Sequence, residues 1–206
     1  MAVIPKENLS RIRRFYYDNL KSAKDIAEEL GVSVDAVYYF MRRNELKRRT
    51  LSEDNKVRFL RKPPSFRLKR SLNSREKYLE LAGLMLYWSE GAKTGSGSAI
   101  DFANSDPQMI KVFMKFLREI FGVQEKRIRV LLYCYADQNI NELINFWSKV
   151  AGVSRRQFTK PYVRKDFRKE GRKMLYGLVH VRYSDKKLLS VILDLIEDHK
   201  NAIIRN

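Results

Sequence analysis

Apolar residues spaced three and four positions apart in residues 7–43 predict three short helices. Gly31 suits the tight turn before the third helix, and the small Ala27 lets the second and third helices cross closely. The pattern predicts a helix-turn-helix domain over residues 1–48, with an ordinary small helical hairpin as the alternative. Because Ser22 and Ser33 are natural N-caps, the expected helices are Glu7–Tyr17, Ser22–Leu30 and Ser33–Arg43.

The third helix would be the recognition helix of such a domain. Its outward side chains are then expected to meet base edges and phosphates in a DNA groove. Tyr38 has an alternative place, packed inward against Ile12 or Phe15. The expected contact residues are Ser33, Asp35, Tyr38, Tyr39, Arg42 and Arg43.

Residues 49–73 read as a basic linker between two domains. The helical spacing fades after Leu60, and the adjacent prolines Pro63 and Pro64 follow. Arginines in such a linker would follow phosphates along a groove without specifying sequence, and a merely solvated charge run is the alternative. The expected contacts are Arg58, Arg61, Arg67 and Arg70.

The remaining residues, 74–206, predict an α+β domain. Three times a β-like segment runs into an aspartate that is expected to cap an amphipathic helix, at Asp106, Asp137 and Asp185. Further β-like runs at Gln157–Arg164 and Met174–Tyr183 give the order helix, strand, helix, strand, helix, strand, strand, helix. This order favours a mixed sheet that helices cover on one face.

Alternation within two of the strands tells which face is covered. Residues 128, 130, 132 and 134 are apolar, and so are 175, 179 and 181, whereas the opposite sides carry mainly Arg, Tyr and His, with Leu131 among them. A sheet with such an open face is suited to lie on a nucleic-acid backbone, although an ordinary half-solvated sheet is the alternative. The expected contacts on the second domain are Arg127, Arg129, Lys160, Arg164, His180 and Arg182.

Charge supports a polyanionic partner. The 206 residues carry a net charge of +18, and a hydrophobic fraction of 44% is typical of a globular protein. Residues 42–75 hold 13 basic and 3 acidic residues, and residues 155–173 hold 9 and 2, so nearly all of the excess lies in two short segments. Generic solubility would scatter the charge. Clustering favours nucleic acid, with double-stranded DNA as the expected partner.

Composition also excludes several classes. No apolar run approaches the roughly 20 residues that span a bilayer, and the first residues lack the apolar core of a signal peptide. Neither basic segment has the continuous apolar face of a membrane-surface helix. We therefore expect a soluble, cytoplasmic, nucleoid-associated protein without a membrane partner. A single cysteine, Cys134, and two histidines exclude an intrachain disulfide, a cysteine zinc cluster and a metal site built from three histidines.

The stretch LAGLMLYWSEGAK, residues 81–93, ends an apolar helix on Glu90. Negative charge is mildly unfavourable at a helix C-terminus, so the position of Glu90 needs a reason. The simplest reason is a surface ion pair with Lys93. A helix that begins LAG, ends acid-Gly and precedes a small α+β sheet resembles the LAGLIDADG family of homing endonucleases and its non-cleaving relatives.

The resemblance implies that two such helices pack side by side through small residues, here Ala82 and Ser89 with Leu86 between them. It further implies a homodimer, because only one motif is visible, and a divalent metal such as Mg²⁺ bound by Glu90 near the scissile phosphate. The predicted function is DNA binding with possible metal-dependent endonuclease activity. The alternatives are a catalytically inactive, sequence-specific transcription regulator and an RNA-binding protein whose Tyr133 and Tyr135 stack bases.

Overall fold

The computed structural model describes residues 4–93, 99–165 and 174–205, and the chain divides into two compact units. The first unit is Met1–Pro63 and the second is Pro64–Asn206. The first is helical, and the second contains a mixed four-stranded sheet packed with helices, which makes this an α+β protein. Among the described residues, no helix combines the length and the apolar character needed to cross a membrane.

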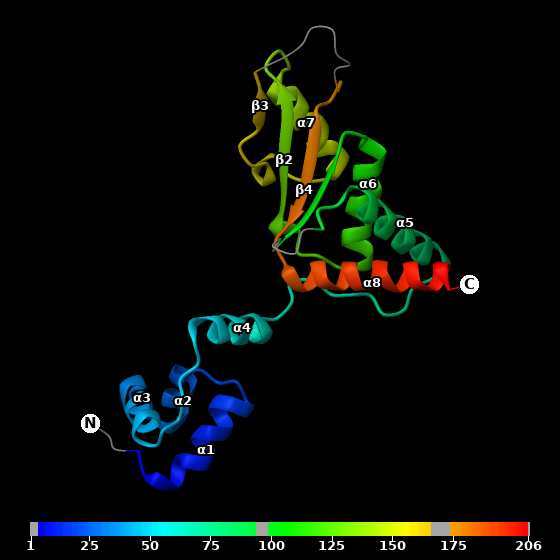
Figure 1. Cartoon of the computed structure of the whole chain (residues 1–206). Helices are drawn as coiled ribbons and strands as arrows, with labels where there is room; N and C mark the ends of the chain where they lie inside the picture. Colours follow the sequence, from blue (N-terminus) through cyan, green and yellow to red (C-terminus); the bar gives the residue numbers. More distant parts are fainter. Residues whose placement is uncertain (1–3, 94–98, 166–173, 206) are drawn as a thin grey trace. The chain divides into compact units, whose positions relative to one another are not determined.

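The first unit contains the expected helices (Figure 1). Ser22 caps α2 in a capping box with Asp25, and the hydroxyl of Ser33 accepts from the amide of Ala36 at the start of α3. Gly31 ends α2 with a φ of 66°, a conformation that favours glycine. The elements are η1 Lys6–Asn8, α1 Leu9–Arg13, the π-helical turn η2 Arg14–Asp18, α2 Ala23–Leu30, α3 Val34–Arg43 and α4 Leu51–Arg61.

Helix α4 occupies much of the segment that the sequence favours as a linker. Thr50 caps it in a capping box with Glu53, and Val57 is buried. The side chain of Arg49, only 9% exposed, ties this segment to the rest of the first unit. Its guanidinium donates to Asp54 Oδ1 at 2.8 Å and to two backbone carbonyls, those of Tyr16 and Lys21. Arg49 is therefore a structural residue.

The second unit confirms the predicted order of helices and strands. Strand β1 pairs antiparallel with β4, β4 pairs antiparallel with β2, and β2 pairs parallel with β3, giving the order β1-β4-β2-β3. The elements are α5 Ser74–Glu90, β1 Ile100–Asn104, α6 Pro107–Lys115, η3 Phe116–Ile120, η4 Glu125–Arg127, β2 Ile128–Tyr135, α7 Ile140–Ala151, η5 Arg155–Gln157, β3 Tyr162–Arg164, β4 Leu178–Tyr183 and α8 Lys186–Ile204.

Some local predictions are confirmed and others are wrong. Asp106 and Asp185 cap α6 and α8, as expected. Asp137 does not cap α7; that role belongs to Asn139, whose side chain accepts from two backbone amides. Strand β4 begins only at residue 178, so Leu175 lies outside the strand and is 72% exposed instead of facing the core.

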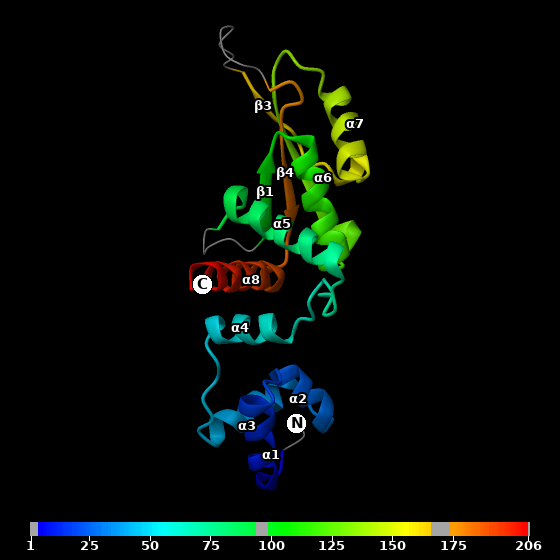
Figure 2. The ribbon, with the colours of Figure 1, turned by 90° about the vertical axis from the view of Figure 1, so that its right-hand side faces the viewer.

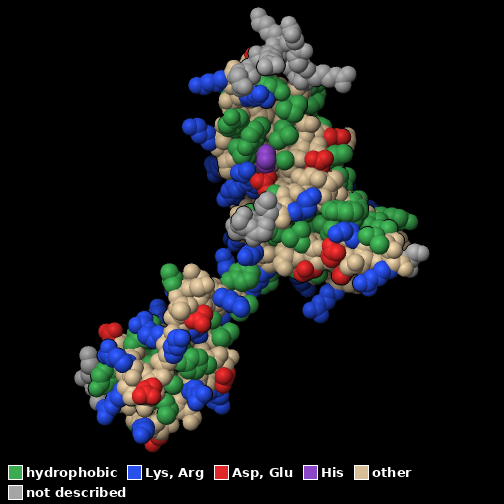
Figure 3. Space-filling model, viewed as in Figure 1, with side chains coloured by type: hydrophobic (Ala, Val, Ile, Leu, Met, Phe, Trp, Pro, Cys, Tyr) green, Lys and Arg blue, Asp and Glu red, His purple; other side chains and the backbone are tan. Residues whose placement is uncertain are grey.

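The sheet has one buried and one open face. In β2, residues 128, 130, 132 and 134 are buried and the alternate positions are not, as the sequence predicts. Helices α6 and α7 lie on the same side of the sheet (Figure 2). Figure 3 views the opposite face, where green hydrophobic side chains lie over the strands and blue basic side chains gather along the margin at which Figure 1 places β3.

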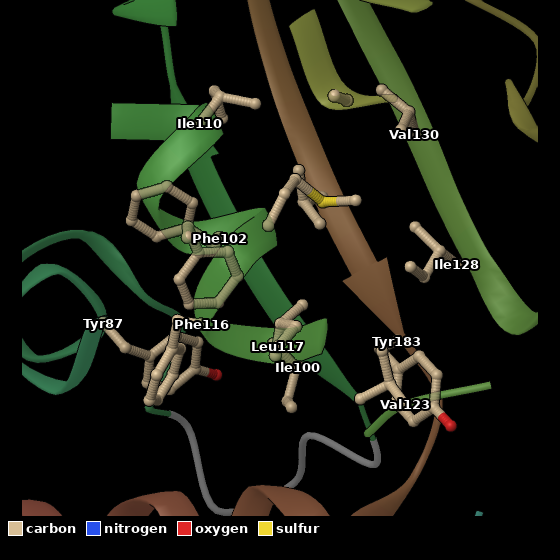
Figure 4. Close-up of a cluster of buried hydrophobic side chains, with 14 of the residues drawn as sticks. Tyr87, Ile100, Phe102, Ile110, Phe116, Leu117, Val123, Ile128, Val130 and Tyr183 are labelled. Carbon is tan, nitrogen blue, oxygen red and sulfur yellow. The ribbon is translucent and has the colours of Figure 1, made fainter. Parts of the chain in front are cut away.

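The core of the second unit joins the buried sheet face to α5, α6, α7 and α8. Figure 4 shows part of it, with Tyr87 of α5 and Ile110 of α6 beside residues of the strands. Phe113 stacks on Phe102, with ring centroids 4.2 Å apart. Gly83 of α5 lies directly against Phe116, because a Cβ built at residue 83 would be 2.1 Å from Cγ of that ring. The glycine of the LAG motif therefore serves close packing within the chain.

The segment 64–70, which we call the strap, is anchored to the second unit. Buried Ser65 donates to Asp185 Oδ2 from its amide at 2.8 Å and from its hydroxyl, and the Tyr183 hydroxyl donates to the Ser65 carbonyl. The amides of Arg67 and Lys69 donate to the carbonyls of residues 121 and 120, each at 2.8 Å. The strap is thus part of the second unit, which explains why the boundary falls between Pro63 and Pro64.

Candidate nucleic-acid interface

The outward surface of α3 carries basic and aromatic side chains. Tyr39 is 52% exposed, and the Arg42 guanidinium carbon lies 5.8 Å from the centroid of its ring. Arg42 and Arg43 are exposed, and among the described residues neither forms an ion pair with an acid. Asp35 is exposed in the first turn, where a carboxylate is favourable to the helix dipole. Two arginines on this helix therefore keep their charge available.

Two other residues expected on this surface are already engaged. Tyr38 is half-buried and packs against the core of the first unit, and the Arg48 guanidinium carbon lies 3.8 Å from its ring centroid. The Ser33 hydroxyl caps α3. Arg48, which is exposed, extends the basic surface beyond the end of the helix.

The four arginines in residues 58–70 differ in whether their side chains pair with an acid and in which unit they belong to. Arg61 pairs with Asp25, the carboxylate of the α2 capping box. Arg58, Arg67 and Arg70 are exposed, and the strap amides of Arg67 and Lys69 are bonded to the end of η3. Arg67 and Arg70 therefore belong to the second unit and not to the unit that contains α3.

Three polar side chains form a network on the open face of the sheet. His180 Nδ1 lies 2.7 Å from Asp101 Oδ1, and Arg182 Nε donates to Asp101 Oδ2 at 2.8 Å. Burial raises the pKa of Asp101, but the hydrogen bonds and charges of His180 and Arg182 outweigh it, so the pKa lies below its usual value. The carboxylate fixes two of the predicted contact residues and offsets part of their charge.

The other expected residues of the second unit divide into two places. Arg129 is exposed on the open face, and Lys160 and Arg164 are exposed on and beside β3. Arg127 is not with them: its guanidinium carbon lies 5.6 Å from the ring centroid of buried Tyr183, and it donates to the carbonyl of residue 184. The 3-10 turn η4 breaks the alternation before β2 begins. Residues 166–173 of the basic segment lie outside the described residues.

Glu90 ends α5, is exposed and has no basic partner among the described residues. Lys93 instead donates to the carbonyl of Trp88. Within the described ranges no group of three His, Cys, Asp or Glu side chains could hold a metal ion. A single exposed carboxylate does not provide the oxygen ligands that Mg²⁺ needs, so the described residues of one chain do not fit that ion.

Helix α5 also presents an apolar surface to solvent. Tyr78 is 76% exposed, Leu81 and Trp88 are exposed, and Met85 is half-buried. Ala82 lies on the same side of the helix and is exposed. The side of α5 that carries Gly83 and Leu84 is buried, so this exposed apolar surface is separate from the side that packs against the core.

Sequence reasoning missed Asp101 as a functional residue. It stands 79 positions before His180, and only the pairing of β1 with β4 brings the two together. The single signal in the sequence was an acid at an outward position of a β-like run. Comparison with protein-family models, curated proteins and solved structures finds no match to this chain.

Proposed function

We propose that this protein binds double-stranded DNA, with α2, the Gly31 turn and α3 acting as a helix-turn-helix. The observation that carries the proposal is the outward surface of α3, where Arg42 and Arg43 have no acidic partner among the described residues and Tyr39 lies beside them. Arginine on a helix of this kind reads guanine in the major groove or contacts phosphate. The N-caps at Ser22 and Ser33 hold the two helices in place.

The open face of the second unit supplies a second contact region. Arg129, Lys160 and Arg164 are exposed there, and the strap adds Arg67 and Arg70. Such residues contribute phosphate contacts that strengthen binding to any sequence. Binding by α3 would then specify the site and binding by the second unit would add affinity.

The exposed side of α5 supports a homodimer. Tyr78, Leu81 and Trp88 place apolar surface on one helix, and the small Ala82 allows the backbone of a second copy to come close. A twofold pair of α5 helices would present two α3 surfaces to a near-palindromic DNA site. We propose binding without cleavage, as in a transcription regulator, because the described residues of each chain offer no group of ligands that could hold a metal ion.

The α3 surface is tested by replacing one arginine. Arg42→Ala should weaken binding to a selected duplex site by about 1 to 3 kcal/mol and relax the preference at one or two base pairs, if this side chain reads guanine. Affinities for the site and for random duplex are measured by fluorescence anisotropy. Lys115→Ala is the matched control, because it removes one exposed charge from α6 of the second unit, which lies on the covered face of the sheet and not on the open one.

Equal losses on the selected site and on random duplex would make Arg42 a phosphate contact. Unchanged affinity for both would contradict the proposal that α3 enters a groove. A similar loss in Lys115→Ala would show that overall charge, rather than the α3 surface, governs binding.

A further inference from the structure

The open face of the sheet carries a row of three aromatic rings from neighbouring strands. His180 lies on β4, Tyr133 on β2 and Tyr162 on β3. The centroid of the Tyr133 ring lies 4.8 Å from that of His180 and 4.8 Å from that of Tyr162, with interplanar angles of 32° and 35°. The rings are thus tilted against one another at centroid distances typical of favourable aromatic pairs.

One end of this row is fixed by hydrogen bonds. Asp101 accepts from Arg182 and lies 2.7 Å from the His180 ring nitrogen, so the imidazole has a defined orientation. Tyr133 packs against that imidazole and is half-buried. The row is therefore preorganised before any ligand arrives, which lowers the entropy lost on binding.

The other end of the row is open. Tyr162 lies on the edge strand β3 and is 55% exposed. One side of its ring faces Tyr133, and among the described residues no further ring lies against the other side. A planar group can extend the row by stacking there.

A cavity of about 390 Å³ adjoins this open end. This volume lies within the range of small-molecule sites, roughly 300 to 1,000 Å³. The cavity walls are aromatic or apolar except for one arginine, so the site suits a planar ring with an anionic group attached. The lining includes Tyr133, Tyr135, Tyr162, Arg164, Met174 and Leu178.

We infer that an unpaired nucleobase stacks on Tyr162 at the end of this row, with its phosphate beside Arg164. This inference rests on the proposed function, because it specifies which form of nucleic acid binds to the open face. In a duplex each base is covered by its neighbours on both sides, so only a single strand or a locally unpaired stretch can supply the ring. The aromatic and apolar cavity walls can contact any of the bases. The site would therefore bind a base by stacking, without preference for a sequence.

A single-stranded oligonucleotide that contains 2-aminopurine tests this site, because the fluorescence of this base falls when it stacks. Wild type should bind the strand and quench the probe. Tyr162→Leu should weaken binding by about tenfold and leave the probe bright, whereas Tyr162→Phe keeps the ring and should behave as wild type. Tyr176→Leu is the matched control, since it removes an exposed tyrosine that stacks on Phe146 of α7. Circular dichroism confirms that each variant is folded.

Equal binding and quenching by wild type and Tyr162→Leu would overturn the inference, and so would an equal loss in Tyr176→Leu. Binding to duplex DNA without any binding to the single strand would also overturn it, while leaving the proposed function intact. The same strand is tested in deoxyribose and ribose form. Quenching of either strand that depends on Tyr162 supports base stacking at this site. The form that binds more tightly shows whether the natural ligand is DNA or RNA.

Discussion

Gly83 of α5 packs directly against the ring of Phe116. Because an added Cβ would lie 2.1 Å from Phe116 Cγ, Gly83→Ala forces α5 away from η3 or the ring away from the core. Overpacking of this kind costs about 1 to 3 kcal/mol, so we expect the Tm to fall by several degrees. Thermal unfolding followed by circular dichroism measures it. Ser89→Ala, exposed on the same helix, should leave the Tm almost unchanged.

Asp185 holds two parts of the second unit with one carboxylate. Its Oδ1 accepts from the amides of Lys187 and Leu188 at the start of α8, and its Oδ2 accepts from Ser65 in the strap. Burial raises the pKa of Asp185, but these hydrogen bonds outweigh it and lower the pKa below the ordinary value. The carboxylate is therefore stabilising only while it is ionised.

The pH dependence follows from that direction. Above the pKa of the unfolded chain, about 3.9, the stabilisation by Asp185 is fully present, and it is lost as the pH falls through the lower pKa of the folded state. Asp185→Asn should cost about 1 kcal/mol at pH 7 and should flatten the decline of Tm below about pH 4. Asp194→Asn is the control, because it changes an exposed carboxylate on the same helix. If the Tm of Asp185→Asn still declines in acid as steeply as that of wild type, this role of Asp185 is contradicted.

At the scale of elements, periodicity predicted the order of helices and strands in the second unit because elements such as α6, α7 and β2 have one clearly apolar side. The sheet order β1-β4-β2-β3 was not predictable, since it depends on pairings between distant segments. The network of Asp101, His180 and Arg182 could not be predicted from the sequence for the same reason. Helix α4 was missed although Thr50 and Glu53 have the spacing of a capping box, because the nearby prolines and basic residues favoured a linker.

Helix α5 can be tested as a dimer contact through Ala82. Ala82→Arg places a long charged side chain on the exposed apolar surface, so we expect it to prevent close pairing of two copies and to produce a monomer. Sedimentation velocity measures the mass of the protein in solution. Loss of the dimer should also lower the affinity for a twofold DNA site. A wild-type protein that is monomeric and binds such a site normally would contradict pairing through α5. Lys115→Ala, on α6, should not alter the mass.

At the scale of the whole molecule, the clustered charge predicts a steep dependence of duplex binding on salt. Each arginine that contacts a phosphate releases a counterion and adds roughly 0.9 to the slope of log affinity against log salt. Combined replacement of Arg58, Arg67 and Arg70 by alanine should flatten that slope equally for specific and random duplex. Arg61 is left in place because it pairs with Asp25. An unchanged slope would remove these residues from the interface.

The strap also limits how the two units can share one DNA molecule. Helix α4 ends at Arg61 and Ser65 is already anchored, so only residues 62–64 connect the units, and two of these are prolines. The four Cα–Cα steps from Arg61 to Ser65 reach roughly 14 Å when extended, which is about four base-pair steps. If both units contact the same duplex, we therefore expect their footprints to be contiguous. Five extra base pairs inserted between them would turn one footprint to the opposite side of the double helix and uncouple the two.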